Sequence, residues 1–259
     1  MANKKTLPIN TSDEGLKTQF IDIAVGDVTM PAYVAAPEGS GRFPVLLVIQ
    51  EIFGVHAHIQ DICRRFAHEG FLAIAPELYV RQGDPTQYVD IESLVAGIVS
   101  QVPDDQVMAD LDACIVWAGL NGGDLTRVSA TGYCWGGRIT WLYAAHQPML
   151  RAAVAWYGRL TKGHGPLQTI QPIDLVEKID APVLGLYGGL DAGIPIADVL
   201  AMRHALKGGT DKAKDSEIHV YDDADHGFYA DYRPMYNPKA AKDAWRRCLA
   251  WLHSHGCAP

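Results

Sequence analysis

The stretch Arg127-Val-Ser-Ala-Thr-Gly-Tyr-Cys134-Trp-Gly-Gly137 leads from an apolar run through a glycine-rich turn toward a predicted helix. Its centre, Gly132-x-Cys134-x-Gly136, is the G-x-S-x-G nucleophile elbow with sulfur in place of oxygen. The glycines are needed because the nucleophile sits on a strained turn where bulky neighbours would clash. At the helix N-terminus, the helix dipole and free N–H groups stabilise a thiolate or an oxyanion. Cys134 is therefore a candidate nucleophile.

The other cysteines favour a structural interpretation. Five cysteines, widely spaced and without a CxxC pair, indicate neither a disulfide framework nor a zinc knuckle, and fit reduced thiols in a cytosol. Cys63, Cys114 and Cys248 lie on apolar helical faces, where we expect buried thiols. A buried structural cysteine is also the alternative for Cys134, but its motif favours the nucleophile.

Short apolar runs on both sides of the elbow predict the sheet. They stand alone between loops or helical stretches, at Val45–Ile49, Phe71–Ala75, Val128–Ala130, Ala152–Tyr157 and Val183–Tyr187. Runs without alternation are typical of strands buried on both faces, and such strands belong to parallel sheets. A strand-like Ile218–Tyr221 follows them. Upstream, alternating segments on either side of Gly26-Asp27, one of them containing Pro31, predict an antiparallel hairpin at a sheet edge.

Helical stretches separate these strands. Apolar residues recur at helical spacing over Ile59–Ala67 and Val107–Ala118, and further helices are expected after Gly136, over Pro195–Leu206 and over Lys239–Leu252. Strands alternating with helices make βαβ units, and right-handed crossovers then give one open, doubly wound, mostly parallel α/β sheet. Ligands bind such a sheet beyond the carboxyl ends of its strands.

Length and composition limit the possible classes of protein. The 259 residues are 48% hydrophobic and 20% charged, which excludes disorder, collagen and a coiled coil. The formal net charge of -8 makes nucleic acid an unexpected partner. No apolar run approaches the ~18 residues of a membrane span, so we expect a soluble, cytoplasmic protein. Without a repeat or linker, we expect a single domain over residues 1–259, with residues 1–17 as an extended arm.

A cysteine nucleophile needs a base and an orienting acid, which follow it along the chain in this class of fold. Asp191 comes just past the strand-like run that ends at Tyr187, and His226 lies in a loop past the next strand. We predict these two residues as acid and base. Competing acids adjoin the histidine at Asp222, Asp223 and Asp225, but a run of acids in a loop is more often a solvated turn.

The same edge of the sheet offers an oxyanion hole. The backbone N–H after the nucleophile, that of Trp135, and one from the loop after the Val45–Gln50 segment, for which we choose Ile52, are the expected donors. His56-x-His58 could suggest a metal, but without a further ligand at suitable spacing the pair is more typical of surface residues at a helix start. We predict no metal and no cofactor.

Taken together, these motifs resemble the dienelactone hydrolase family of α/β-hydrolases. The resemblance rests on the Gln50–Gly54 loop, the Gly132–Gly137 elbow, the Gly189-x-Asp191 acid and the His226-Gly227-Phe228 base, and spans roughly residues 43–251 in order and spacing. It implies an α/β-hydrolase fold with a Cys134–His226–Asp191 triad. The implied activity is hydrolysis of an unsaturated lactone, carboxymethylenebutenolide, in the breakdown of aromatic compounds.

The resemblance also implies roles for three charged residues. Glu51 matches a glutamate that contacts the resting thiol, where its charge disfavours the thiolate until a substrate carboxylate displaces it. The alternative for Glu51 is a surface salt bridge. Arg81 matches one of two arginines that hold the substrate carboxylate. The second should follow the histidine closely, but here Arg233 arrives later, so it is either a substitute or a surface arginine.

The predicted partner is thus a small, anionic lactone or ester. A carboxylesterase or thioesterase of broad specificity using the same triad is the second possibility. The third is a non-catalytic α/β-hydrolase fold that binds a ligand or partner. The sequence leaves the oligomeric state open, as monomer or small homo-oligomer.

Overall fold

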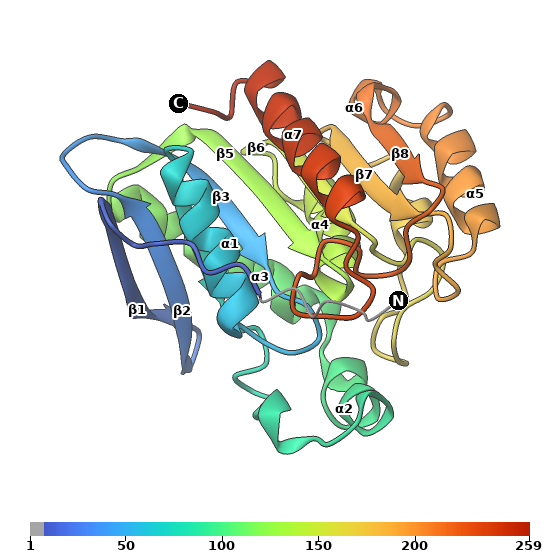
Figure 1. Cartoon of the computed structure of the whole chain (residues 1–259), viewed down its shortest axis with the longest axis horizontal. Coiled ribbons are helices and arrows are strands. Elements are labelled where there is room, and N and C mark those ends of the chain that lie inside the picture. The colour runs from blue at the N-terminus through green and yellow to red at the C-terminus, as the bar shows by residue number, and fades with distance from the viewer. Residues whose placement is uncertain (1–7) are drawn as a thin grey trace, which may run out of the picture.

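The computed structural model describes residues 8–259, which form one eight-stranded sheet with helices on both faces (Figure 1). The strands are β1 (Leu16–Val25), β2 (Val28–Pro37), β3 (Phe43–Ile49), β4 (Leu72–Pro76), β5 (Gly123–Tyr133), β6 (Leu150–Trp156), β7 (Val183–Gly188) and β8 (Glu217–Tyr221). The helices are α1 (Ala57–His68), α2 (Ile91–Gly97), α3 (Asp104–Leu120), α4 (Trp135–His146), α5 (Ile196–Leu206), α6 (Asp211–Asp215) and α7 (Pro238–Ser254). Short 3₁₀ helices lie at Pro85–Gln87, Val99–Gln101 and Pro172–Leu175.

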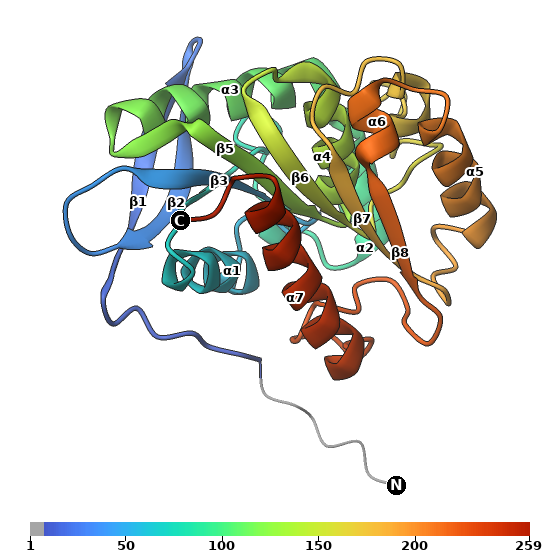
Figure 2. The ribbon, with the colours of Figure 1, turned by 90° about the horizontal axis from the view of Figure 1, so that it is seen from above.

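The strand order is β1-β2-β4-β3-β5-β6-β7-β8. The strands from β4 to β8 along this order pair in parallel, whereas β1 pairs antiparallel with β2, and β2 with β4. Helices α1 and α7 lie on one face of the sheet, and α3 and α4 on the other (Figure 2). The predicted doubly wound sheet with an antiparallel edge hairpin is confirmed.

Burial follows the position of each strand in the sheet. Every residue of β4 and β7 is buried, as expected for strands covered by helices on both faces. Strand β1, at the edge, buries only Leu16 and Ile23. The thiols of Cys63, Cys114 and Cys248 are buried, as predicted, and so is Cys257.

Two elements differ from the sequence-based expectation. Strand β1 begins at Leu16, so residues 16 and 17 belong to the sheet rather than to the arm, and residues 1–7 of the arm lie outside the described residues. Helix α2 was not predicted, because its seven residues are too few for a periodic pattern. It begins after Asp90, whose carboxylate accepts a hydrogen bond from the N–H of Ser93 at 2.8 Å.

Within residues 8–259, no helix combines the length and apolar character needed to cross a membrane. The parallel strands all run in one direction, so their carboxyl ends meet along one edge of the sheet. The loops that follow β3, β5, β6, β7 and β8 carry the residues described next.

Candidate active site

The turn between β5 and α4 has the geometry of a nucleophile elbow. Cys134 occupies φ 56° and ψ -113°, a strained conformation for a residue other than glycine. A Cβ at Gly132 would collide with the carbonyl of Gly136 and with Thr140, and a Cβ at Gly136 would collide with the carbonyls of Ile49 and Gln50. Both glycines are thus required by close backbone approach, as the motif predicts.

Cys134, His226 and Asp191 form one chain of hydrogen bonds. The Sγ atom of Cys134 lies 3.2 Å from Nε2 of His226, and Nδ1 of the same ring lies 2.7 Å from Oδ2 of Asp191. The other oxygen of Asp191 accepts hydrogen bonds from the N–H groups of Gly193 and Ile194, at 2.8 and 3.0 Å. The acid is thereby fixed while its second oxygen orients the ring.

The competing acids lie elsewhere. The Asp225 carboxylate accepts a hydrogen bond from the backbone N–H of His226, at 2.6 Å, and does not bond the ring. The carboxylates of Asp222 and Asp223 form no hydrogen bond with the described residues, as expected for a solvated turn. The structure therefore brings Asp191, and none of the three loop acids, to the imidazole.

The environment of His226 favours its charged form. Burial alone would lower the pKa of the ring, but the neighbouring Cys134 sulfur and the Asp191 carboxylate outweigh burial and raise the pKa to about 10. An imidazole with this pKa is protonated at neutral pH, and the Asp191 carboxylate at 2.7 Å is its counterion.

The two backbone N–H groups that the sequence predicts as oxyanion donors come from the elbow and from the β3–α1 loop. Trp135 is the first residue of α4, so its N–H has no partner within the helix. The N–H of Ile52 donates to no acceptor among the described residues, and Ile52 lines the same cavity as Cys134. Both groups are thus available to an oxygen bound beside the sulfur.

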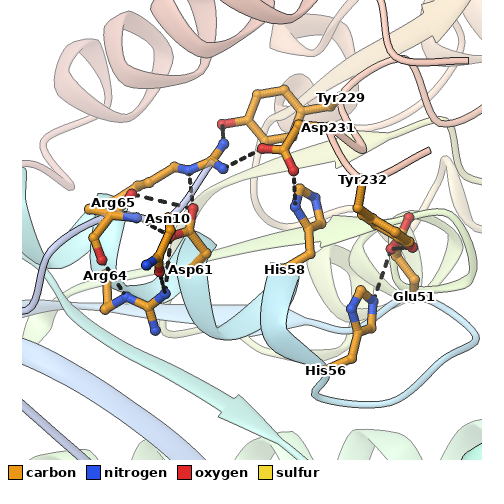
Figure 3. Close-up of polar contacts among 11 residues, drawn as sticks. Asn10, Glu51, His56, His58, Asp61, Arg64, Arg65, Tyr229, Asp231 and Tyr232 are labelled. Carbon is orange, nitrogen blue, oxygen red and sulfur yellow. Dashed lines mark hydrogen bonds and ion pairs between the residues drawn. The ribbon is translucent and has the colours of Figure 1, made fainter. Parts of the chain in front are cut away.

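Glu51 lies in the β3–α1 loop and is buried (Figure 3). Its Oε2 atom accepts hydrogen bonds from Nε2 of His56, at 3.2 Å, and from the hydroxyl of Tyr232, at 2.7 Å. Burial would raise the pKa of Glu51, but the hydrogen bond from His56 and the nearby charge of His58 lower it overall. The alternative of a surface salt bridge is therefore wrong. Among the described residues, no hydrogen bond joins Glu51 to the thiol of Cys134.

His56 and His58 lie at the start of α1, as expected, but they are not both surface residues. His56 is the residue before the helix and is half-buried, whereas His58 is buried, with Nδ1 3.2 Å from Oδ1 of Asp231. Each ring therefore has a carboxylate partner of its own. In residues 8–259, no three His, Cys, Asp or Glu side chains gather closely enough to hold a metal ion.

A cavity of about 260 Å³ opens beside the sulfur. Its apolar wall includes Ile91 and Val95 of α2, and two arginines, Arg159 and Arg233, line it together with His164. The Arg159 guanidinium also donates to the carbonyl of Gly163 at 2.9 Å. The cavity thus combines a candidate nucleophile with two cationic side chains.

The expectation for Arg81 has to be corrected. Its guanidinium forms two hydrogen bonds to the buried carboxylate of Asp110 on α3, at 2.9 and 3.0 Å, and it does not line the cavity. The pairing neutralises a charge that α3 would otherwise bury alone. Arg233 does line the cavity, with its guanidinium carbon 5.6 Å from the ring centroid of Phe53.

Sequence reasoning missed several residues at this site, among them Tyr157, Arg159 and Tyr232. Tyr157 and Arg159 directly follow β6, so their position just past a buried strand was an available signal. Tyr232 lies 181 residues from Glu51 along the chain, and nothing local in the sequence indicates their contact.

Comparison with known proteins identifies the family of the chain. The sequence model of the dienelactone hydrolase family matches residues 30–256. A "putative carboxymethylenebutenolidase" of Escherichia coli O157:H7 is 54% identical over 249 residues, covering 96% of this chain and 91% of that protein. A protein of the same description from Methylorubrum extorquens is 48% identical and covers 96% of this chain and 85% of its own length.

The solved structures include a similar protein. The crystal structure of a "putative dienelactone hydrolase" from Klebsiella pneumoniae has a TM-score of 0.88 and 52% identity, covering 92% of this chain and 98% of that one. The family match spans most of the chain, and the Escherichia coli relative shares more than half of its aligned residues with this chain. The chain therefore belongs to the dienelactone hydrolase family and is a hydrolase of ester or lactone bonds.

Proposed function

We propose that the enzyme hydrolyses small anionic lactones or esters, with a dienelactone as the reference substrate, through a Cys134–His226–Asp191 triad. The observation that carries the proposal is the hydrogen-bonded chain from Sγ of Cys134 through His226 to Asp191, at the wall of a cavity that two arginines also line.

The proposed cycle is acyl transfer in two halves. The Cys134 thiolate attacks the lactone carbonyl, the N–H groups of Trp135 and Ile52 stabilise the oxyanion, and the ring opens to give a thioester. An enolate leaves readily, so little acid assistance is needed. Acylation removes the negative charge from sulfur and lowers the pKa of His226, so the imidazolium gives its Nε2 proton to the departed enolate. The neutral ring then takes a proton from water as the water oxygen attacks the thioester carbonyl, and the C–S bond breaks to release the acid and the Cys134 thiolate.

Arg159 and Arg233 are the candidate residues for the substrate carboxylate. Both line the cavity with Cys134, and a guanidinium suits a carboxylate because it can donate two parallel hydrogen bonds. Arg159 takes the place that the resemblance gave to Arg81.

The test is kcat/KM for a dienelactone and for an uncharged ester of similar size, with Cys134→Ala as the blank. A Cys134-dependent preference for the dienelactone supports the proposal. Activity that survives in Cys134→Ala contradicts the triad. Cys134-dependent activity on the neutral ester alone favours the second candidate, a broad carboxylesterase, which the apolar Ile91 and Val95 wall would also suit.

A further inference from the structure

The loop that follows β6 forms one wall of the cavity, and α2 forms another. Arg159 and His164 of this loop line the cavity, and so do Ile91 and Val95 of α2. The two walls come from connections that are far apart in the chain, so their relative position depends on the contacts between them.

A buried glutamine joins the two connections. Gln168 is only 2% exposed, and both ends of its amide form hydrogen bonds. The Oε1 atom accepts from the backbone N–H of His164 at 2.7 Å, and the Nε2 atom donates to the carbonyl of Val99 at 2.8 Å. Val99 begins the 3₁₀ helix that follows α2. Because a buried amide is costly unless it is hydrogen-bonded, the folded protein retains both contacts.

The middle of the loop depends on this glutamine. Within the part of the chain that the structure describes, residues 162–167 form hydrogen bonds only with Arg159 and Gln168 of the same loop. The amide of Gln168 is therefore the hydrogen-bonded link from this segment to another element. Close packing occurs at the same place, because a Cβ at Gly165 would collide with Ser100 of the 3₁₀ helix.

The two ends of the loop are anchored independently. Arg138 of α4 is fully buried and donates two hydrogen bonds to Asp104 at the start of α3, at 2.6 and 2.8 Å, and one to the carbonyl of Ile170 at 2.6 Å. At the other end, the N–H of Tyr157 donates to a carbonyl of β7 at 2.8 Å. Only the middle of the loop is thus left for the glutamine to hold.

The position of this middle segment matters for Arg159. The Nη1 atom of Arg159 donates to the carbonyl of Gly163 at 2.9 Å, and its guanidinium forms no other hydrogen bond with the described residues. The remaining N–H groups are available to a carboxylate. A shift of Gly163 away from the 3₁₀ helix would move the guanidinium with it. Misplacement by about 1 Å can cost about a hundredfold in rate.

We propose that Gln168 is a positioning residue for substrate selection, which fixes the loop after β6 against the 3₁₀ helix after α2 and so places Arg159 in the cavity. The inference rests on the proposed carboxylate-binding role of Arg159 and deepens it, because it names the contact that sets the place of this arginine. Gln168 itself does not line the cavity, so it acts through the loop.

The first test is a pair of variants that separate the two ends of the amide. Gln168→Met keeps the length of the side chain and removes both hydrogen bonds, whereas Gln168→Glu keeps an acceptor for His164 and loses the donor to Val99. For an anionic ester, KM should rise about tenfold in both variants with kcat within about twofold, because binding is weakened and the triad is untouched. KM for a neutral ester of the same size should change by less than about twofold. A native KM for the anionic ester in either variant overturns the proposal.

The double variant of Gln168→Met with Arg159→Ala tests whether the glutamine acts through the arginine. If it does, the double variant should lose no more of the preference for the anionic ester than Arg159→Ala alone. A general weakening of the enzyme would instead add to the loss in both backgrounds, and this additive result contradicts the proposal.

Gln147 provides a matched control. Its amide also uses both ends, because Nε2 donates to Asp112 at 2.7 Å and Oε1 accepts from the N–H of Met149 at 3.1 Å, but it lies just past α4 and outside the cavity. Gln147→Met should leave KM for both esters unchanged. Equal changes of KM in Gln147→Met and Gln168→Met would show that the loss of any glutamine bridge has this effect, and the positioning role would be rejected.

Amide hydrogen exchange of the full-length protein gives a readout that does not depend on activity. In Gln168→Met, exchange in residues 162–168 should be about tenfold faster, while α7 keeps its native rate. Native exchange in this segment of the variant overturns the proposal. Gly165→Ala pushes the same two segments apart by steric contact with Ser100 and should repeat both effects, so it replaces Gln168→Met if that variant fails to fold.

The outcomes separate this inference from the proposed function. Activity that survives in Cys134→Ala rejects the triad, while KM and amide exchange still decide the role of Gln168. A native KM in Gln168→Met, in an enzyme whose Arg159→Ala variant has lost its preference for anions, rejects the inference alone. A native preference for anions in Arg159→Ala rejects both the role of this arginine and the inference.

Discussion

Two loops place a histidine in the same cavity, and their surroundings shift the two imidazoles in opposite directions. In the β8–α7 loop, His226 lies between Cys134 and Asp191, which raise its pKa to about 10. In the loop after β6, burial and the charges of Arg159 and Arg138 lower the pKa of His164 to about 3. One wall of the cavity thus carries the ion pair of His226 and Asp191, and the other wall carries Arg159 beside the neutral ring of His164. The neighbours, rather than the residue type, decide the charge.

Removal of the orienting acid should have the largest effect on the difference between the two histidines. Asp191→Asn leaves the shape of the His226 wall but removes the charge that holds the ring, so kcat should fall by about 10⁴-fold. Steady-state hydrolysis of a dienelactone measures this fall. Asp225→Asn, which alters a loop acid not bonded to the ring, should change kcat far less. Equal losses in the two variants would remove Asp191 from the triad.

Arg81 lies outside both walls, so its replacement should affect the stability of the fold and not the hydrolysis of substrate. Arg81→Ala leaves the Asp110 carboxylate buried without its partner, and should lower the free energy of unfolding by about 3 kcal/mol. Urea denaturation measures the loss. The kcat/KM of the folded variant should remain within about twofold for an anionic ester. A selective rise in KM for anions would instead return Arg81 to the binding site.

The cationic wall is tested by its arginine. Arg159→Ala removes a charged hydrogen-bond donor from the cavity, and should reduce kcat/KM for an anionic substrate by about tenfold to a hundredfold, with little effect on a neutral ester of the same size. Parallel kinetics with the two substrates give the ratio. Arg151→Ala, at an exposed arginine of β6, serves as the control. A loss that is equal for both substrates would mean that Arg159 supports the fold rather than selects charge.

The smallest effect concerns the neutral imidazole. Because the folded protein lowers the pKa of His164, the unfolded chain binds its proton first, and stability is lost as pH falls below about 6.5. At about pH 5, His164→Gln should remove about 1 to 2 kcal/mol of that loss. Urea unfolding at two pH values measures it, with His68→Gln as the exposed comparison. An identical pH slope in native protein and variant would show that His164 is not held neutral.

The sequence predicts those parts of the site that depend on local backbone geometry. The elbow around Cys134 is readable because its glycines are required by sterics, and Asp191 and His226 are readable because they follow buried strands in a fixed order. The sheet can also be predicted, because uniformly apolar runs are typical of strands that are covered by helices on both faces.

What the sequence does not predict depends on the reach of long side chains. Arg81 and Arg159 both follow strand ends, yet one turns to Asp110 and the other to the cavity, and only the packing of α3 separates them. The contact between Glu51 and Tyr232 likewise joins loops far apart in the chain. Such pairings are tertiary, so no local pattern carries them.

Helix α2 lies apart from the strands that carry the candidate catalytic residues (Figure 1). It nevertheless gives Ile91 and Val95 to the cavity wall. Part of the cavity wall is therefore built by a segment that carries none of the candidate catalytic residues. We expect substitutions at these two positions to change the shape of the cavity while leaving the contacts among Cys134, His226 and Asp191 in place.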